Sequence, residues 1–333
     1  MRERLLALRE VLGKYGKYRD VIGYPLFYLF CLAIFVPVTF PYDKVKERVV
    51  SSFNADQRSS GGQQELQIEG LSGYWLTGVR MTGVTLLSAP SEPGKPPTKL
   101  AIDSATVRYA VLPALIGHSD LGFDAEAFGG EVSGSFDVNG KDKSLDATIE
   151  TVDLGKVAPL VELLGVPLEG KLGGSVHLAL PEGRLSKATG QVSLESKGTS
   201  VGDGKAKIKG ALALPKLEVG TISIAADAKD GVMKLMKFAA GGKDLELQGD
   251  GRVTLRERVT DSLWDVQVRF RLNDVYRARN DITKSLFGVP GSSAPALFEL
   301  ADPKVVQSKR ADGFYAWTVR GALAHLDFQP AAR

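Results

Sequence analysis

The chain has 333 residues and a formal net charge of +3. Its first twenty residues hold six basic and three acidic side chains, so the remainder is formally neutral and its charge does not indicate a nucleic-acid binder. Cys31 is the only cysteine, which excludes an intrachain disulfide and a thiolate metal site in the rest of the chain.

An uncharged apolar segment follows the basic N-terminal residues. No charged residue occurs between Val21 and Tyr42, and a helix of about 20 apolar residues is long enough to cross the hydrocarbon core of a bilayer. We therefore predict a tail at 1–20 and a transmembrane anchor at 21–42. The residues assigned to the anchor are Val21, Tyr24, Phe27, Phe30, Ile34, Phe35, Val36 and Phe40.

The flanks of this segment predict its orientation. The excess of Lys and Arg before it favours a cytoplasmic N-terminus, which places the C-terminal body in the periplasm of a bacterial inner-membrane protein. A cleaved signal peptide is the alternative, but no small-x-small cleavage site follows the apolar run.

Two kinds of segment are predicted between the anchor and the body. Val45, Val49 and Phe53 recur at helical spacing, so Asp43–Phe53 is expected to form a charged helical stalk, and Asn54–Gln64 a polar loop. Residues 43–64 are thus a stalk and loop, and 65–333 the body. A further loop is expected at Ser88–Lys99, which contains four prolines.

Alternation of apolar and polar residues dominates the body. It is clearest in 121–127, 132–138, 145–149, 176–180, 208–214, 222–226 and 264–272. This period places the apolar groups of a strand on one face. Four pairs of turn residues predict short antiparallel connections: Asn139-Gly140, Asp203-Gly204, Asp230-Gly231 and Asp312-Gly313. The predicted fold is mainly β, an elongated antiparallel meander with one apolar face. That face could close on itself, form a sandwich or line an open groove.

A few helices and aromatic pairs interrupt this pattern. Asp153 is predicted to cap a short helix that carries Val157, Leu160, Val161 and Leu164, and Ala278–Phe287 is predicted as another helix. The aromatic residues of Tyr74-Trp75 and of Tyr315-Ala316-Trp317 are expected to close the ends of the β-core. The alternative is that they bind a partner or a lipid headgroup.

The order of these pieces resembles a known group of envelope proteins. LAIDSATVRYAVLPALIGHSDLGFDAEAFGGEVSGSFDV and VPLEGKLGGSVHLALPEGRLSKATGQVSL are similar to the AsmA-like superfamily. TFPYDKVKERV, GYWLTGVRMTGVTL and the segment from Phe287 to Leu323 resemble more specifically GspN, the N component of type II secretion systems in its δ-proteobacterial form.

The resemblance implies a non-enzymatic component of a secretion system, anchored in the inner membrane. Its partners would be other inner-membrane or periplasmic components of that system. The alternative is an AsmA-like envelope protein that binds or transfers lipid along an apolar β-groove. Membrane lipid is an expected partner under both hypotheses, nucleic acid is not, and the oligomeric state is left open.

Sequence motifs for catalysis or cofactor binding are not found. The three histidines, His118, His177 and His325, lack a second histidine at ligand spacing. The chain contains neither a phosphate-binding G-x-x-x-x-G-K-[ST] loop nor a G-x-S-x-G nucleophile motif. We therefore expect no enzyme activity, no cofactor and no metal site, and we expect His177 to be a solvated strand residue.

Overall fold

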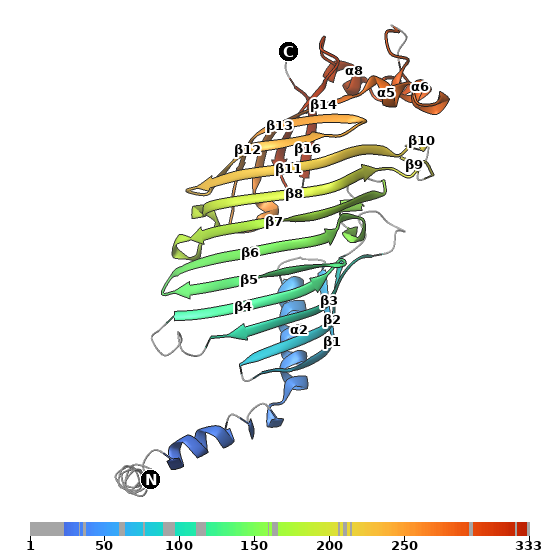
Figure 1. The fold of residues 1–333 in the computed structure, drawn as a ribbon. Helices are drawn as coiled ribbons and strands as arrows, with labels where there is room; N and C mark the ends of the chain where they lie inside the picture. Colours follow the sequence, from blue (N-terminus) through green and yellow to red (C-terminus); the bar gives the residue numbers. More distant parts are fainter. Residues whose placement is uncertain are drawn as a thin grey trace, which may run out of the picture.

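The computed structural model describes most of the chain. The described residues are 23–32, 34–35, 38–59, 64–75, 77–88, 97–110, 118–158, 160–161, 166–205, 207–208, 212–213, 215–292, 296–323 and 325–331. Figure 1 shows a long twisted sheet, with the N-terminal helices at one end and a group of short C-terminal helices at the other.

A single antiparallel sheet of 14 strands forms the body. Its strands are β1 (Gln64–Tyr74), β2 (Gly78–Ser88), β3 (Thr98–Tyr109), β4 (His118–Ala127), β5 (Gly130–Asn139), β6 (Asp142–Asp153), β7 (Leu168–Leu180), β8 (Thr189–Val201), β11 (Leu217–Lys229), β12 (Val232–Gly241), β13 (Leu245–Thr254), β14 (Leu263–Leu272), β15 (Tyr315–Ala322) and β16 (His325–Pro330). Each strand pairs with the preceding one in this series, and β1 and β16 do not pair with each other, so the sheet is not closed. The prediction of a mainly β antiparallel meander is confirmed.

A small side hairpin lies between β8 and β11. It consists of β9 (Lys207–Ile208) and β10 (Leu212–Ala213), which pair only with each other. The alternating run predicted at 208–214 therefore does not join the main sheet.

Strand β14 illustrates how the alternating pattern forms the sheet. Val266 and Leu272 are buried and Trp264, Val268 and Phe270 are half-buried, whereas Gln267, Arg269 and Arg271 between them are exposed. Apolar and polar side chains thus separate to opposite faces, as the period of two requires.

Two of the four predicted turns connect neighbouring strands. Asp230 and Gly231 form a two-residue hairpin loop, with φ of 49° and 76°, between the paired residues Lys229 and Val232. In the β5–β6 hairpin Asn139 pairs with Asp142, so the loop residues are Gly140 and Lys141.

The other two pairs form turns with a positive φ at the glycine, but neither connects two strands of the main sheet. Asp203-Gly204 leads from β8 into the side hairpin, and Asp312-Gly313 lies between a helix and β15, where Lys309 and Tyr315 form an antiparallel bridge around the turn. The sequence pair favours a turn in both places, but which elements the turn joins depends on tertiary pairing.

β-bulges interrupt several of the ladders. The register shifts between Ile102 and Ser104 in β3, between Ile149 and Val152 in β6, and between Glu169 and Lys171 in β7. Bulges bend a strand and increase its local twist, which accounts for part of the curvature that Figure 1 shows.

Helix α2 (Tyr42–Ser59) replaces the predicted stalk and part of the predicted loop. The stalk was expected to end at Phe53, which is wrong, because the helix continues for another six residues. Asn54 explains the difference: its side-chain amide is bonded to the backbone of Leu66 in β1, accepting from the N–H at 2.8 Å and donating to the C=O at 3.3 Å.

The predicted anchor is described in part. Residues 23–32 are helical, and the side chains of Tyr24, Phe27 and Phe30 are more than 60% exposed. Ile34, Phe35 and Phe40 are also exposed, while Val21 and Val36 lie outside the described residues. Among the residues that are described, no helix is both long enough and apolar enough to span a membrane. The anchor therefore stays a prediction.

The helices inside the body begin at different residues from those predicted. The carboxylate of Asp153 does accept a hydrogen bond from the Gly155 N–H, but the element it caps is a single 3₁₀ turn, Leu154–Lys156. Leu160 and Val161 lie in a further helical stretch, and Leu164 is outside the described residues.

The helix predicted at Ala278–Phe287 is α6 (Asp281–Phe287), which begins three residues later than predicted and follows a separate short helix, α5 (Asp274–Arg277). Asn280 separates them because it forms a capping box with Thr283, in which each side chain bonds the backbone N–H of the other. Two more helices, α7 (Leu297–Ala301) and α8 (Pro303–Ser308), lead to β15. We call α5–α8 the C-terminal helices.

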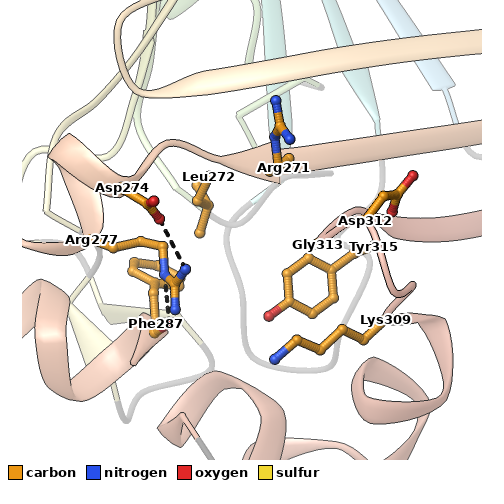
Figure 2. A pocket seen from close by; sticks show the side chains of 9 residues that line it. All are labelled: Arg271, Leu272, Asp274, Arg277, Phe287, Lys309, Asp312, Gly313 and Tyr315. Carbon is orange, nitrogen blue, oxygen red and sulfur yellow. Dashed lines mark hydrogen bonds and ion pairs between the residues drawn. The ribbon is translucent and has the colours of Figure 1, made fainter. Parts of the chain in front are cut away.

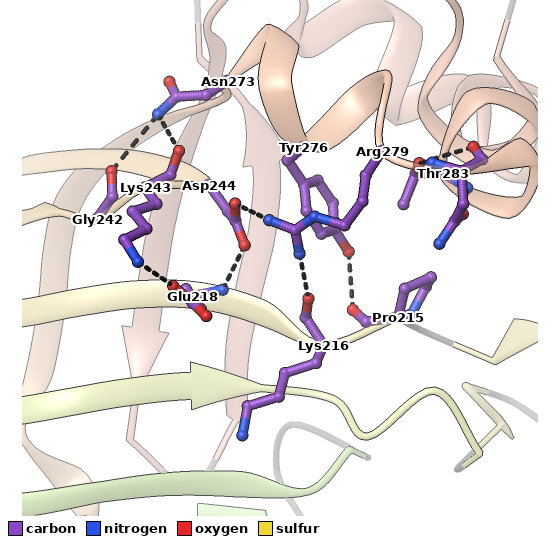
Figure 3. Close-up of polar contacts among 11 residues, drawn as sticks. Pro215, Lys216, Glu218, Gly242, Lys243, Asp244, Asn273, Tyr276, Arg279 and Thr283 are labelled. Carbon is purple, nitrogen blue, oxygen red and sulfur yellow. Dashed lines mark hydrogen bonds and ion pairs between the residues drawn. The ribbon is translucent and has the colours of Figure 1, made fainter.

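A polar cluster joins α5 to the beginning of the interior strands β11 and β13 (Figure 3). The carboxylate of Asp244, which is fully buried, accepts hydrogen bonds from the Glu218 N–H at 2.8 Å and from Arg279. The Tyr276 hydroxyl donates to the carbonyl of Pro215 at 2.8 Å. Burial, and then the charge of Asp244, raises the pKa of Tyr276 to about 12, so the phenol remains a donor at neutral pH.

Candidate functional site: the apolar face of the sheet

Residues on neighbouring strands that pair with each other form unbroken apolar rows across the sheet. The first row is Gly73, Val79, Val107, Phe123, Gly134, Ala147, Val176, Val192, Ala226, Leu235, Gly251, Val266, Val319 and Phe328. Paired residues point to the same side of a sheet. This row therefore contributes one apolar position on every strand from β1 to β16 of the main sheet.

Two more rows flank the first at a spacing of two residues. One is Leu71, Met81, Ala105, Ala125, Val132, Ile149, Gly174, Leu194, Ile224, Phe238, Gly249, Val268, Trp317 and Pro330. The other is Tyr109, Leu121, Phe136, Leu145, Leu178, Gly190, Ala228, Met233, Val253, Trp264, Gly321 and Leu326. We call the three rows together the apolar face.

Coverage of this face differs along the sheet. On β12–β14, Ala240, Leu245 and Leu272 continue the same face of the sheet beyond the second row and are buried against Tyr276 of α5 and Phe287 of α6. Val253 and Val266, which belong to the rows, are buried in a second cluster. These clusters form a conventional core at the C-terminal end of the sheet.

On β3–β8 the same face is only half-buried. The side chains at Phe123, Phe136, Leu145, Val176 and Leu194 are all of intermediate exposure. Within the described part of the chain, neither buried cluster includes any row residue of β3–β8. Six strands thus present a contiguous apolar surface that lacks the burial expected of a packed core.

Aromatic side chains cover two of the glycines of the face. A Cβ added at Gly134 would lie 2.8 Å from the Cζ atom of Phe123, and one at Gly249 would overlap the ring of Phe238. Rings that lie over strand glycines fill the space of the missing side chains. The surface is therefore continuous across these positions.

The opposite face of the sheet is polar and carries ion pairs between neighbouring strands. His177 approaches Asp146 at 2.6 Å, Arg271 approaches Glu246 at 2.7 Å and Arg320 approaches Asp265 at 2.9 Å. All six side chains are at least one-third exposed, and exposed ion pairs contribute little to stability. His177 lies where it was predicted, on a solvated strand face.

A small cavity lies between β14 and the C-terminal helices (Figure 2). Its volume is about 210 Å³, and Arg271, Arg277 and Lys309 line it. Each of these cations has a carboxylate partner: Glu246 for Arg271, Asp274 for Arg277 and Glu299 for Lys309. The cavity is smaller than typical ligand pockets. Because each of its three cations is paired with a carboxylate, we do not assign it as an anion-binding site.

The residues around this cavity are bound together as a structural cluster. Lys309 and the hydroxyl of Tyr315 donate to the Glu299 carboxylate at 2.6 and 2.8 Å. Burial by itself would raise the pKa of Glu299, but these hydrogen bonds outweigh it and hold the pKa below its usual value. Burial and the bond to Glu299 both raise the pKa of Tyr315.

The predicted aromatic residues fall into two groups. Tyr315 is buried and Trp317 half-buried at the C-terminal core, as expected. For Trp75 the expectation of a core position is wrong, because it is 82% exposed at the tip of the β1–β2 hairpin. Its backbone adopts a φ of 52°, the left-handed conformation found in tight turns.

Sequence reasoning identified alternating strands but not the apolar rows. The first two rows depend on the register of thirteen strand pairs and the third on eleven, and register depends on turn geometry and bulges as well as on the apolar pattern. In the described residues, no group of three or more His, Cys, Asp or Glu side chains is arranged to hold a metal ion.

Comparison with known proteins identifies no relative. No family model, no curated protein and no solved structure matches this chain.

Proposed function

We propose that the body is a non-enzymatic lipid-binding surface of an inner-membrane-anchored periplasmic protein, and that acyl chains lie along the apolar face of β3–β8. The observation that carries the proposal is the set of three apolar rows, which are continuous across these strands and yet only half-buried. The geometry favours this function over the secretion role that the sequence resemblance placed first.

The dimensions and energetics of the face suit an acyl chain. Six strands spaced about 4.8 Å apart extend over about 24 Å, which exceeds the half-thickness of about 15 Å of the hydrocarbon core of a bilayer. Each methylene removed from water contributes about 0.8 kcal/mol. A chain along the face would also cover side chains that are now partly hydrated.

Native mass spectrometry of the purified full-length protein tests the proposal. We expect phospholipid masses on the wild type, and a strong loss of lipid in Leu145→Lys, which places a charge in the apolar rows. Ser144→Lys is the matched control, because the neighbouring residue lies on the polar face of the same strand β6, where its hydroxyl is 3.4 Å from Asp137.

Equal lipid occupancy in both variants, or no lipid on the wild type, would contradict the proposal. Thermal unfolding of both variants checks that each is folded. Photo-crosslinkers at Val132, Phe136, Val176 and Leu178 give an independent readout, since each should react with lipid acyl chains.

A second proposed function is assembly of a type II secretion system through protein contacts. The resemblance to GspN supports it, as does strand β16 at the end of the sheet, since the strand that ends a sheet can pair with a strand of a partner. Deletion of the gene should then reduce export of a secreted substrate. Unchanged export, with unchanged amounts of the other secretion components, would count against this role.

A further inference from the structure

The tip of the β1–β2 hairpin presents a tryptophan in an unusual way. Trp75 follows β1 and is 82% exposed, with a φ of 52°. Left-handed backbone positions normally hold Gly, Asn or Asp, and a bulky side chain there is uncommon. A large amphipathic ring is therefore exposed at a turn position that usually holds a small residue.

The same tip lies beside the point where the chain leaves its apolar N-terminal segment. Tyr42 opens α2, and its ring packs against that of Phe40 with centroids 4.9 Å apart. Gly73 of β1 lies directly against the Tyr42 ring, because a Cβ there would approach the Cζ atom to 2.9 Å and overlap the hydroxyl. The hairpin end and the start of α2 are therefore in contact, at the N-terminal end of the molecule in Figure 1.

Two arginines flank the aromatic residue next to Trp75. Arg80 and Arg108 place their guanidinium groups 5.8 and 5.9 Å from the centre of the Tyr74 ring. Arg108 is paired with Asp124, whereas among the described residues Arg80 has no carboxylate partner. The hairpin end thus combines Trp and Tyr rings with an arginine available to an anion.

This combination suits the surface of a bilayer. Trp and Tyr are enriched at the level of the lipid headgroups, and arginine binds phosphate through parallel hydrogen bonds. The apolar segment before Tyr42 brings the hairpin to such a surface if that segment is the anchor. Phe27 and Phe30, within it, are exposed as lipid-facing side chains would be.

We propose that the β1–β2 hairpin is a second membrane contact, in which Trp75 lies among the headgroups of the bilayer crossed by the anchor and Arg80 binds a lipid phosphate. The inference rests on the proposed function and deepens it, because Gly73 and Val79 next to the tip begin the first apolar row. The contact holds the beginning of the apolar face against the bilayer, so that an acyl chain can pass onto it with little exposure to water.

Depth-dependent quenching in proteoliposomes tests this contact. The full-length chain is prepared with Cys31→Ser and a single labelled cysteine at Thr77→Cys, an exposed residue of the same tip, so that Trp75 stays in place. The vesicles consist of phosphatidylethanolamine and phosphatidylglycerol and contain headgroup spin-labelled lipid. The control label is Asp230→Cys, an exposed position at the tip of the β11–β12 hairpin, far along the sheet. We expect strong quenching at position 77 and little at position 230.

Quenching at position 77 no greater than at position 230 would overturn the proposal, as would a label at 77 that is shielded only when a protein partner is added. Lipid occupancy by native mass spectrometry separates the two ideas. If the hairpin contact alone is absent, the wild type still carries lipid. If the proposed function fails, no lipid is found whatever the quenching result.

Arg80→Ala should reduce quenching in anionic vesicles more than in purely zwitterionic ones.

Discussion

Asp120 and Asp137 stand directly opposite each other on β4 and β5. Desolvation, followed by the charge of Asp137 and a hydrogen bond with it, raises the pKa of Asp120. For an acid whose pKa is higher in the folded state, ionisation costs stability. The stability that the protonated Asp120 carboxyl contributes is complete below its pKa in the unfolded chain. It is lost as the pH rises through its pKa in the folded protein.

We predict that Asp120→Asn stabilises the protein at neutral pH by about 0.5 kcal/mol, because like charges in opposed strand positions repel each other. The gain should disappear below about pH 4, where the native carboxyl is protonated. Urea unfolding at pH 7 and pH 3.5 measures it. Asp227→Asn, on the exposed side of β11, should have no such effect, and an equal gain in both variants would refute the explanation.

Single residues also show what a sequence can predict. The faces of Trp264 and His177 followed from alternation alone, because a strand has a period of two whatever its neighbours are. The position of Trp75 did not follow, since its exposure depends on a turn conformation that composition does not specify. An aromatic pair next to a Gly-rich stretch is equally compatible with a core end and a hairpin tip.

Helix α2 protects the first edge of the sheet. Besides the two hydrogen bonds between Asn54 and Leu66, Lys46 donates to the carbonyl of Glu69 at 3.2 Å. The Asn54 side chain occupies the place of a neighbouring strand, since it satisfies both backbone groups of one residue. An unprotected edge strand can pair with another chain and lead to aggregation.

We predict that Asn54→Ala destabilises the attachment of α2 by about 1 kcal/mol, the usual net contribution of such hydrogen bonds. Hydrogen exchange of the Leu66 amide should accelerate, and the protein should aggregate more readily. Ser52→Ala on the same helix, which is exposed, serves as control. Unchanged exchange at Leu66 in Asn54→Ala would show that the amide does not protect this edge.

Element boundaries were predictable only where local chemistry decides them. Asp153 was recognisable as a capping residue, because capping depends on residues within one turn, although the element that it caps is a single 3₁₀ turn. The capping box at Asn280 was not recognised, and the helix that it starts was predicted three residues too early. The end of α2 was not predictable, because it depends on a hydrogen bond to a strand twelve residues further along the chain.

At the scale of the whole molecule, coverage of the apolar face divides the sheet into two parts. The C-terminal strands are packed against α5 and α6, whereas among the described residues the apolar rows of β3–β8 belong to neither buried cluster. Opening free energies vary within a protein according to the burial of each region.

We therefore predict that amides of β13 and β14 exchange more slowly than those of β4 and β5, although all four strands are paired on both sides. Hydrogen exchange with mass spectrometry measures the difference. Added phospholipid should slow exchange in β4 and β5 and leave β13 and β14 nearly unchanged. Uniform protection along the sheet would contradict this division.

The topology of the sheet was predictable from the sequence, but its shape was not. Alternating runs separated by turns favour a meander, because neighbouring strands connected by short loops pair most readily. Whether the sheet closes depends on accumulated twist and on bulges such as those in β3 and β6. The sequence therefore left an open groove and a closed core as equal possibilities.

The consecutive order of the strands has a consequence for biogenesis. Apart from the side hairpin, every strand of the main sheet pairs with the strand made just before it. A chain that emerges N-terminus first can thus add each strand to a growing edge as soon as that strand is exposed. No strand of the main sheet has to wait for a distant one, and α2, which covers the starting edge, precedes the first hairpin in the chain. The order of strand pairing therefore matches the order of synthesis.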